Sequence, residues 1–473
     1  MNTKKPNVLL ILIDDMGWKD VRLSGSTFYE SPHIDALMRN GMHFTNAFSS
    51  CPVCSPSRAS ILTGKYPATL GLTDWIDESG TLHPLKGKLI DAPYIKHIPT
   101  GETNLAMLLH ANGYKTYHVG KWHLGTEPYY PQHNGFDVNK GGCFWGRPLH
   151  GYFSPYDIPQ FENGPDGEYL TDRLTDEAIQ LIHQAGDTPF YMNLWHYSVH
   201  IPCEAPQDLI AYFRQKAQRL GLDSINPFVE GEDFATLDKV GQKVTRRIFQ
   251  SDPVYAAMIA NLDANIGRII DALKETNKLD DTLLIFSSDN GGLSSAEGSP
   301  TCNYPAAEGK GWMYDGGIRV PLSFTWKGHI EEAKSNDIPT IGADLFPTIL
   351  DFLGIKNERE IDGKSILPCI RGDKIPEELI NRDLFWHYPH YGNQGGKPAS
   401  AIREGAWKLI EFFEDQHVAL YHTKSDISET VNLSEKYPLK TEDLTRKLHC
   451  WRKATHALVP EKNRDFLPKT CLL

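Results

Sequence analysis

The chain has 473 residues, with 48 Lys and Arg against 60 Asp and Glu, which gives a formal net charge of −12. Its 40% of apolar and 23% of charged residues are ordinary for a compact globular protein and exclude a disordered or collagen-like chain. The acidic balance argues against a nucleic-acid or anionic membrane partner, because such partners bind concentrated basic charge. No apolar run approaches the roughly 20 residues that cross a bilayer, so we expect no membrane span.

The first apolar run, at 8–13, follows Lys4 and Lys5 and superficially resembles a signal peptide. It is short, no small-residue cleavage site follows it, and it leads directly into Asp14 and Asp15. We therefore interpret it as a buried strand and expect a cytoplasmic protein. A periplasmic or secreted protein is the alternative if a longer precursor is trimmed.

Four apolar runs rich in β-branched residues predict buried strands, and four amphipathic segments predict helices between and after them. The strands are expected at 8–13, 115–119, 190–195 and 282–287, and the helices at 104–112, 170–185, 255–276 and 344–353. Alternating strands and helices predict an α/β fold whose sheet is covered on both faces. In such sheets ligands bind beyond the carboxyl ends of the strands.

The pattern changes from about residue 382 to short strands and turns. Strands are predicted at 400–403, 407–413 and 418–421, and a helix at 441–452. We therefore expect a catalytic domain over 1–380 and a small antiparallel sheet with a helix over 381–473. The charged and poorly periodic segment 214–244 is predicted to be a surface insertion.

The most specific pattern runs from Cys54 to Gly64 and reads C-S-P-S-R-A-S-I-L-T-G. Pro56 suits the first turn of a helix and Gly64 its end, so Cys54 is expected at a helix N-terminus. Free backbone N–H groups favour an anion there, and Arg58 adds a permanent positive charge. Cys51 and Cys54 also form a C-x-x-C pair, but no second pair completes a zinc site.

This pattern resembles the signature of the sulfatase family, C-x-P-S-R-x-x-x-x-T-G, at every fixed position when it is read from Cys54. Read from Cys51 it fails, because Val53 and Ser55 stand at the positions of Pro and Arg. In sulfatases a maturation enzyme oxidises this cysteine to formylglycine, whose hydrate attacks sulfur through one hydroxyl and expels sulfate through the other. The resemblance implies that Cys54 is converted in this way and that a formylglycine-generating maturase is a partner.

A second stretch, 113–123, reads G-Y-K-T-Y-H-V-G-K-W-H and is similar to the second sulfatase signature, G-Y-x-[ST]-x-x-x-G-K-x-x-H. It departs from that signature in placing the histidine one position early, at His123. Residues two apart in an extended chain face the same side, so Lys121 and His123 should share one rim. The resemblance implies that Lys121 contacts the sulfate and the diol, and that His123 holds a diol hydroxyl.

Two polar pairs follow predicted strands: Asp14 with Asp15, and Asp289 with Asn290. Crowded carboxylates repel one another unless a cation lies between them, and oxygen ligands suit Ca²⁺ or Mg²⁺ better than zinc. The resemblance implies a Ca²⁺ ion held by these four residues and by the formylglycine at Cys54.

Two further residues follow the family pattern on the leaving-group side, His200 and Lys310. His200 is the general-acid candidate because its ordinary pKa lies near neutrality, with His196 as the competing candidate. Family members often carry Pro before that histidine, where this chain has Val199, and Glu before the paired glycines, where it has Asp315.

The segment 420–433 resembles the sulfatase pattern L-Y-x-x-x-x-D-x-x-E-x-x-N-L and is predicted to be an architectural turn. The matches together run from residue 7 to 433. They imply an alkaline-phosphatase-like fold, that is, a large mixed sheet flanked by helices, with the smaller antiparallel sheet and helix at the C-terminus.

The alcohol that such an enzyme would release is less well defined by the sequence. Aromatic and polar residues of predicted loops could stack on a sugar ring and bind its hydroxyls. The candidates are Trp75, Trp145, Arg147, His150, His196, Trp312, His387 and Arg403. We hypothesise a small sulfated saccharide, such as a hexosamine or galactose unit of a glycosaminoglycan or mucin. The alternatives are a phosphonate monoester or phosphodiester hydrolase of the same superfamily, and a catalytically silent glycan-binding protein.

Overall fold

The computed structural model describes residues 5–77 and 79–466, and its main feature is an eight-stranded sheet. Its strand order is β12-β2-β11-β10-β1-β7-β5-β6. The bounds, in that order, are Lys334–Asn336, Met42–Phe44, Leu322–Thr325, Thr282–Ser288, Asn7–Ile13, Phe190–His196, Lys115–Gly120 and Val138–Lys140. The four strands predicted from apolar runs, β1, β5, β7 and β10, lie together in the centre, where both faces of the sheet are covered.

The sheet is mixed because β11 runs antiparallel to both of its neighbours, β10 and β2. The other adjacent pairs are parallel, so the carboxyl ends of β1, β10, β7 and β5 meet at one edge. Ile13 pairs with Ser288 on one side and with His196 on the other. The residues that follow these strands are therefore brought together, although they lie far apart along the chain.

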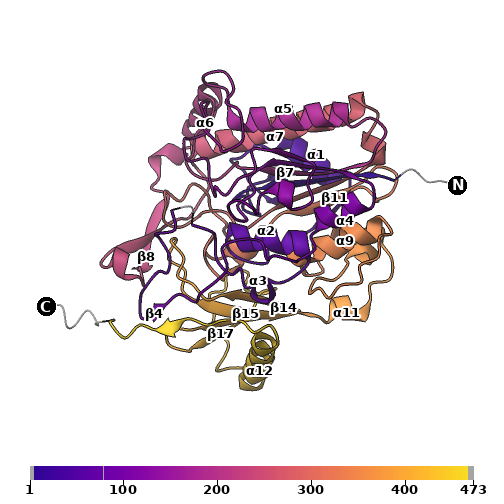
Figure 1. Ribbon diagram of the computed structural model, residues 1–473. Coiled ribbons are helices and arrows are strands. Elements are labelled where there is room, and N and C mark those ends of the chain that lie inside the picture. The colour runs from indigo at the N-terminus through magenta and orange to yellow at the C-terminus, as the bar shows by residue number, and fades with distance from the viewer. Residues whose placement is uncertain (1–4, 78, 467–473) are drawn as a thin grey trace.

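Helices cover both faces of this sheet (Figure 1). One face carries α1 (Pro32–Arg39), α5 (Leu170–Gln184), α6 (Gln207–Arg219) and α7 (Pro253–Glu275). The other carries α2 (Cys54–Thr63), α4 (Leu105–Ala111) and α9 (Leu345–Phe352). Short helices α3 (Pro67–Leu70), α8 (Asp315–Ile318), α10 (Leu367–Arg371) and α11 (Glu377–Ile380) complete the set. The predicted α/β fold with two helical layers is confirmed.

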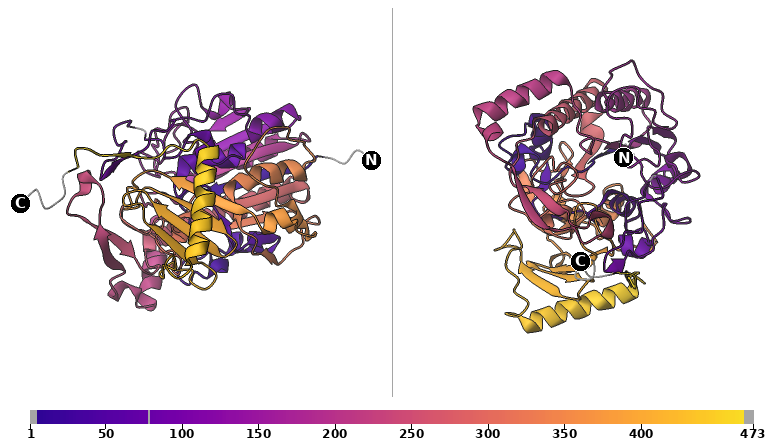
Figure 2. Two further views of the ribbon diagram at one scale, coloured as in Figure 1. Left: turned by 90° about the horizontal axis from the view of Figure 1, so that it is seen from below. Right: turned by 90° about the vertical axis from the view of Figure 1, so that its left-hand side faces the viewer.

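A second, antiparallel sheet has the order β14-β15-β16-β17, with bounds Asp383–Tyr388, Ala399–Glu404, Trp407–Phe412 and Val418–His422. One face lies towards α2 and α3 (Figure 1), and α12 (Pro438–Ala454) covers the other (Figure 2). The predicted small sheet with a helix is therefore present. Its core includes Phe48 and Ile341 from the first part of the chain, so the two sheets are joined by shared packing. The division at 380 stays a prediction, and residues 1–4 and 467–473 lie outside the described residues.

Several segments differ from the sequence prediction, including the short strands β2, β6 and β12 of the large sheet. The segment 214–244 is only partly irregular, because α6 continues to Arg219 and a hairpin of β8 (Phe228–Asp233) and β9 (Lys243–Arg247) follows. β11 and β14 were not predicted. The remaining short strands pair as β3 (Ala47–Phe48) with β13 (Thr340–Ile341) and as β4 (Leu89–Ile90) with β18 (Glu461–Lys462). Within the described ranges, no helix combines the length and apolar character needed to cross a membrane.

Candidate active site at the carboxyl edge of the large sheet

The two acidic pairs lie side by side because their strands, β1 and β10, are neighbours. The Asn290 side-chain amide donates to Asp15 Oδ1 at 2.8 Å, and the Asp15 backbone N–H donates to Asp289 Oδ1 at 3.2 Å. Asp15 has a φ of 61°, which turns the chain sharply after β1. All four side chains, including that of Asp14, are buried. Sheet topology alone thus assembles the oxygen-rich cluster predicted from sequence.

Cys54 is the first residue of α2, as the motif predicted. Its N-cap, Val53, makes no side-chain hydrogen bond to the helix, so the first backbone N–H groups are not capped in that way. Gly64 ends the helix with a φ of 71°, and a Cβ there would lie only 2.9 Å from the Phe346 ring. The ligand atoms of Cys54, Asp14, Asp15 and His200 lie within 4.8 Å of one another. The thiol therefore lies directly beside the acidic cluster.

Three buried cations balance the three carboxylates of the cluster. Arg58 Nε donates to Asp289 Oδ2 at 2.8 Å, and Lys121 Nζ donates to Asp14 Oδ2 at 2.7 Å. Lys310 Nζ donates to Asp15 Oδ2 at 2.8 Å. All of these ion pairs are at least nine-tenths buried. The paired side chains of the cluster therefore carry little net charge. The charge of a bound metal ion would then be balanced by the negative charge of a bound anionic ligand.

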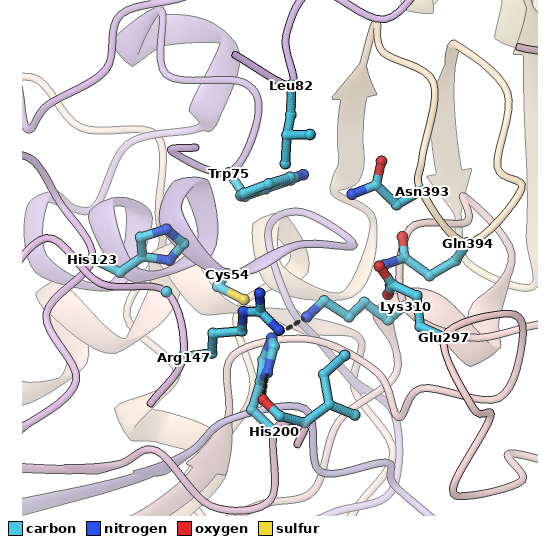
Figure 3. A pocket seen from close by; sticks show the side chains of 12 residues that line it. Cys54, Trp75, Leu82, His123, Arg147, His200, Glu297, Lys310, Asn393 and Gln394 are labelled. Atoms are coloured by element: carbon cyan, nitrogen blue, oxygen red, sulfur yellow. Dashed lines mark hydrogen bonds between the residues drawn. The ribbon is translucent and has the colours of Figure 1, made fainter. Parts of the chain in front are cut away.

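Lys310 also contacts His200. The Lys310 ammonium lies 2.8 Å from His200 Nε2, while His200 Nδ1 lies 2.7 Å from the Ile201 carbonyl oxygen (Figure 3). A neutral ring that donates from Nδ1 to the carbonyl can accept at Nε2 from lysine, so both contacts are satisfied by one tautomer. Burial, and then the charge of Lys310, lowers the pKa of His200 well below its usual value.

Burial also sets the protonation of the groups around it. Desolvation raises the pKa of Asp14 to about 8, although the charge of Lys121 opposes this rise. Desolvation acts in the same direction on Asp15, but Lys310, His200 and Lys121 together outweigh it and bring the pKa of Asp15 below its ordinary value. Burial raises the pKa of the Cys54 thiol far above its usual range. The thiol is therefore neutral at physiological pH and is a poor nucleophile as it stands.

The cluster fits a hard divalent cation. Asp14 Oδ1 and Asn290 Oδ1 are buried oxygens with no hydrogen-bond partner, which is costly unless something else binds them. Both are ligand types that Ca²⁺ prefers, and a cation between Asp14 and Asp15 would offset the repulsion of neighbouring carboxylates.

His123 follows β5 and lies at the same rim as Lys121. It has a φ of 59°, and its Nε2 lies 2.7 Å from the Ile76 carbonyl oxygen. Burial and the nearby Lys121 lower the pKa of His123 well below its ordinary value, so the ring is neutral. Its Nδ1 has no partner and is available to a group bound beside Cys54.

An open pocket with a cavity volume of about 160 Å³ leads from the surface to Cys54. Trp75 and Leu82 form one wall, and the loop residues Asn393 and Gln394 lie across from His123 (Figure 3). The remaining lining residues are His123, Gly146, Arg147, His200, Ile201, Glu297 and Lys310. Of the predicted substrate residues, Trp75 and Arg147 thus line the pocket.

Four predicted substrate residues lie near the pocket or in the core without lining it. Trp145 is buried and stacks on His150, with ring centroids 5.7 Å apart, so this pair flanks Arg147. Trp312 is buried and its indole N–H donates to Ser295 Oγ at 2.9 Å. His196, the last residue of β7, is fully buried, and desolvation lowers its pKa to about 3. Because His196 lies inside the sheet layer, His200 is the one of the two general-acid candidates that reaches the pocket.

His387 and Arg403 lie in the second sheet and serve its packing. His387 contacts Ser400 Oγ at 2.6 Å and the Leu458 carbonyl oxygen at 2.7 Å. Arg403 lies 3.5 Å from Asp315 and stacks over the Phe48 ring. Because strand residues alternate between faces, composition alone could not show that these two side chains point away from the pocket.

Several residues that line the pocket were not predicted from the sequence, above all Glu297, Asn393 and Gln394. Gln394 Nε2 donates to Glu297 Oε2 at 2.6 Å, which joins two loops across the pocket wall. The available signal was the run G-N-Q-G-G at 392–396, a glycine-rich loop that follows β14. Because β14 was not predicted, this loop was not identified as the exit from a strand.

A family model described as "Sulfatase" matches residues 6–355, which is more than half of the chain. The chain belongs to the sulfatase family. A second model, for the C-terminal part of N-sulphoglucosamine sulphohydrolase, matches residues 308–454 and so includes the second sheet. The resemblance first carried by Cys54 and its flanking residues is confirmed.

Known sulfatases are similar over most of this chain. A protein named "Sulfatase" from Formosa agariphila is 30% identical, covering 94% of this chain and 88% of its own. Human N-acetylgalactosamine-6-sulfatase is 29% identical, covering 81% of this chain and 68% of its own. The crystal structure of Ps i-CgsB in complex with a neocarrahexaose superposes with a TM-score of 0.75 at 26% identity and covers 98% of this chain and 96% of that one. This sulfatase is accordingly a sulfuric ester hydrolase with an alkaline-phosphatase-like fold.

Proposed function

We propose that this sulfatase removes an O-sulfate group from a saccharide, using a formylglycine made from Cys54 and a bound Ca²⁺ ion. The observation that carries the proposal is the place of Cys54. It is at once the first residue of α2, the neighbour of the acidic cluster and part of the pocket lining. An anionic ester that enters this pocket meets the helix N-terminus and the nearby cations at its inner end.

The residues of the chain have distinct parts in this proposal. Asp14, Asp15, Asp289 and Asn290 would hold the Ca²⁺ ion together with the modified residue 54. Hydrated formylglycine supplies a hydroxyl nucleophile, and the Ca²⁺ ion supplies positive charge beside it. Arg58 fixes the orientation of Asp289 through the 2.8 Å ion pair, and Lys121 and His123 bind the sulfate and the diol from the same rim.

Lys310 and His200 would act on the leaving alcohol. Lys310 carries the proton of this contact and donates it towards His200 Nε2, which lies 2.8 Å from Lys310 Nζ, and both residues line the pocket. His200 Nε2 can take this proton from Lys310 and pass it to the departing oxygen, which leaves as the alcohol, while Lys310 becomes a neutral amine and Arg147 offsets negative charge. The Ile201 carbonyl keeps the ring in the required tautomer.

The pocket walls favour a sugar as the alcohol. Trp75 offers an aromatic face at the pocket, and the carboxylate and amides of Glu297, Asn393 and Gln394 offer hydrogen-bond partners for hydroxyls. Support also comes from two relatives, one named for action on N-acetylgalactosamine 6-sulfate and one solved with a carrageenan oligosaccharide. A hexosamine or galactose 6-sulfate is therefore the first substrate class to try.

The test is sulfate release by protein produced together with a formylglycine-generating enzyme. The substrates are N-acetylgalactosamine 6-sulfate, galactose 6-sulfate, an aryl sulfate and an aryl phosphonate monoester. We expect turnover of a sulfated sugar, its loss in Cys54→Ala, and its retention in Cys51→Ala, a buried neighbour that does not line the pocket. Preference for the phosphonate ester, or turnover of the aryl sulfate with no sulfated sugar cleaved, would overturn the proposal.

A further inference from the structure

A second cluster of buried titratable side chains lies outside the Cys54 site, on the loop that follows α3. Ligand atoms of Asp74, His83 and Asp91 all lie within 4.8 Å of one another. His83 Nδ1 is 3.3 Å from Asp74 Oδ2 and 3.8 Å from Asp91 Oδ2. The side chains of His83 and both aspartates are at most 2% exposed. No residue of this cluster has a part in the sulfatase chemistry described above.

A second histidine reaches the cluster from the other sheet. His390 comes two residues after β14, and its Nδ1 is 3.7 Å from Asp74 Oδ2. Its other ring nitrogen, Nε2, is 2.8 Å from the hydroxyl of Thr73. That contact holds the ring so that Nδ1 faces Asp74. A hydrogen bond at one imidazole nitrogen is the usual arrangement when the other nitrogen binds a metal.

Three of the four atoms that point into the cluster have no hydrogen-bond partner, and the fourth, Asp91 Oδ2, accepts only from the Leu85 N–H. Asp74 Oδ2, His83 Nδ1 and His390 Nδ1 are each buried and unpaired. Unpaired buried polar atoms are uncommon and costly, and each needs an explanation. Here they converge from three separate points of the chain onto one spot, as ligands around an ion do.

The other carboxylate oxygens of the cluster are, by contrast, hydrogen-bonded, whereas His83 Nε2 is also without a partner. Asp74 Oδ1 accepts the Trp75 backbone N–H at 2.8 Å. Asp91 Oδ1 accepts the Tyr391 N–H at 2.8 Å, and Asp91 Oδ2 accepts the Leu85 N–H at 2.7 Å. Backbone donors thus fix the orientation of both carboxylates, which is how outer partners position metal ligands.

We propose that Asp74, His83, Asp91 and His390 bind one divalent transition-metal ion, for which zinc is the best match. Two imidazole nitrogens and two carboxylate oxygens make a common tetrahedral zinc set, with metal–ligand distances of about 2.0 to 2.2 Å. Tetrahedral ligands at that radius lie roughly 3.3 to 3.6 Å apart. The three measured separations of 3.3, 3.7 and 3.8 Å are close to this, and the His390 ring would have to move towards His83 and Asp91 to complete the site.

The position of the ion gives it a structural part in the pocket. Asp74 precedes Trp75, and His83 follows Leu82, so one side of the site carries one wall of the pocket. His390 precedes Asn393 and Gln394, which form the neighbouring wall (Figure 3). The ion would therefore join the 74–91 loop to the end of β14 and fix the distance between the two walls. It lies outside the Cys54 site and would do no chemistry on the ester.

The experiment measures metal in the full-length protein. Wild type is stripped with a chelator, exchanged into Ca²⁺-containing buffer, titrated with Zn²⁺, freed of excess ion by gel filtration, and analysed by elemental mass spectrometry. We expect one zinc per chain in wild type and none in His83→Gln or His390→Gln. The matched control is His387→Gln, which removes a buried histidine of β14 whose two ring nitrogens already have protein partners.

Cobalt distinguishes this site from the Cys54 site without any variant. Co²⁺ bound by nitrogen and oxygen ligands in a tetrahedron gives visible bands and no thiolate charge-transfer band, whereas Co²⁺ at Cys54 would add one. We expect the visible bands alone in stripped wild type supplied with Ca²⁺. Wild type that retains no zinc and shows no tetrahedral cobalt bands would overturn the proposal, and so would zinc retained equally by His83→Gln. After either result, the charge of the two carboxylates would instead be balanced by a proton on the His83 ring.

Discussion

Lys310 Nζ lies 2.8 Å from His200 Nε2 at the inner end of the pocket. The two residues come from loops 110 positions apart, and Asp15 fixes the lysine by accepting a second hydrogen bond at 2.8 Å. This contact places a charged donor and a neutral ring where a leaving alcohol would depart. It also explains why His200 is held neutral in a buried position.

Replacing Lys310 by methionine is expected to lower kcat about 10²- to 10³-fold, the usual effect of removing one preorganised charged donor. The substrate's KM should change less, because Arg147 and the Ca²⁺ site still attract the sulfate. Steady-state kinetics on the best sulfated sugar would measure both. Lys274→Met, in an exposed i,i+3 pair of α7, serves as the control. A Lys310→Met enzyme with wild-type kcat would contradict its place beside the leaving group.

Removing the cation should abolish activity reversibly. The chain alone already pairs three carboxylates with three cations, so we expect Ca²⁺ to be bound mainly through Asp14 Oδ1 and Asn290 Oδ1, the oxygens without a hydrogen-bond partner. Ca²⁺ at about 100 times its Kd should stabilise the folded state by about 2.7 kcal/mol. Chelation followed by calorimetry and assay, with Ca²⁺ or Mg²⁺ added back, measures this. Full activity after exhaustive chelation would exclude the ion from the mechanism.

Trp75→Ala should weaken the binding of a sugar more than that of a simple aryl ester. A lost stacking contact is worth about 0.5 to 1.5 kcal/mol, which corresponds to a fall of roughly 2- to 13-fold in kcat/KM. Comparing a sulfated sugar with an aryl sulfate separates this effect from damage to the Cys54 site. Trp326→Ala, in a ring pair with His329 beyond the end of β11, is the control. Equal losses on both substrates would argue against Trp75 as a sugar platform.

Lys408→Met should destabilise the fold strongly. Lys408 is fully buried and contacts Asp315 and Glu429, each at 2.8 Å, and thereby ties the second sheet to the loop that carries Lys310. Removing one partner of a buried ion pair lowers the free energy of unfolding by about 3 to 5 kcal/mol, because the remaining carboxylate keeps its buried charge without a counter-charge. Urea unfolding measures the loss. Lys327→Met, which removes an exposed pair with Asp280, should change stability by less than about 1 kcal/mol.

Much of this architecture could be predicted because it depends on local patterns. The central strands are continuous apolar runs, and the residues at their carboxyl ends are polar, so the acidic cluster followed from sheet topology. The short edge strand β11 could not be predicted in the same way, because four residues carry little periodicity. β14 was missed for a related reason: its sequence D-L-F-W-H-Y shows no clear alternation.

The pocket walls were less accessible to sequence reasoning than its inner end. Trp75 and Arg147 line the pocket, whereas Arg403 and His387 have the same kind of side chain and face the interior. What separates the two groups is a partner far along the chain, such as Asp315 for Arg403. The predicted turn at 420–433 is confirmed, with Asn432 Oδ1 accepting the Leu420 N–H at 3.0 Å. Its link to Asp315 through Glu429 depends on tertiary contacts that no local pattern contains.

The most direct test of the account is the mass of the peptide that carries Cys54, isolated from protein made beside a formylglycine-generating enzyme. We predict an aldehyde or its hydrate at position 54 and an intact thiol at Cys51 of the same peptide or its neighbour. Sulfate release should rise in proportion to the converted fraction. An intact Cys54 thiol in protein that nevertheless releases sulfate at full rate would contradict the proposed nucleophile.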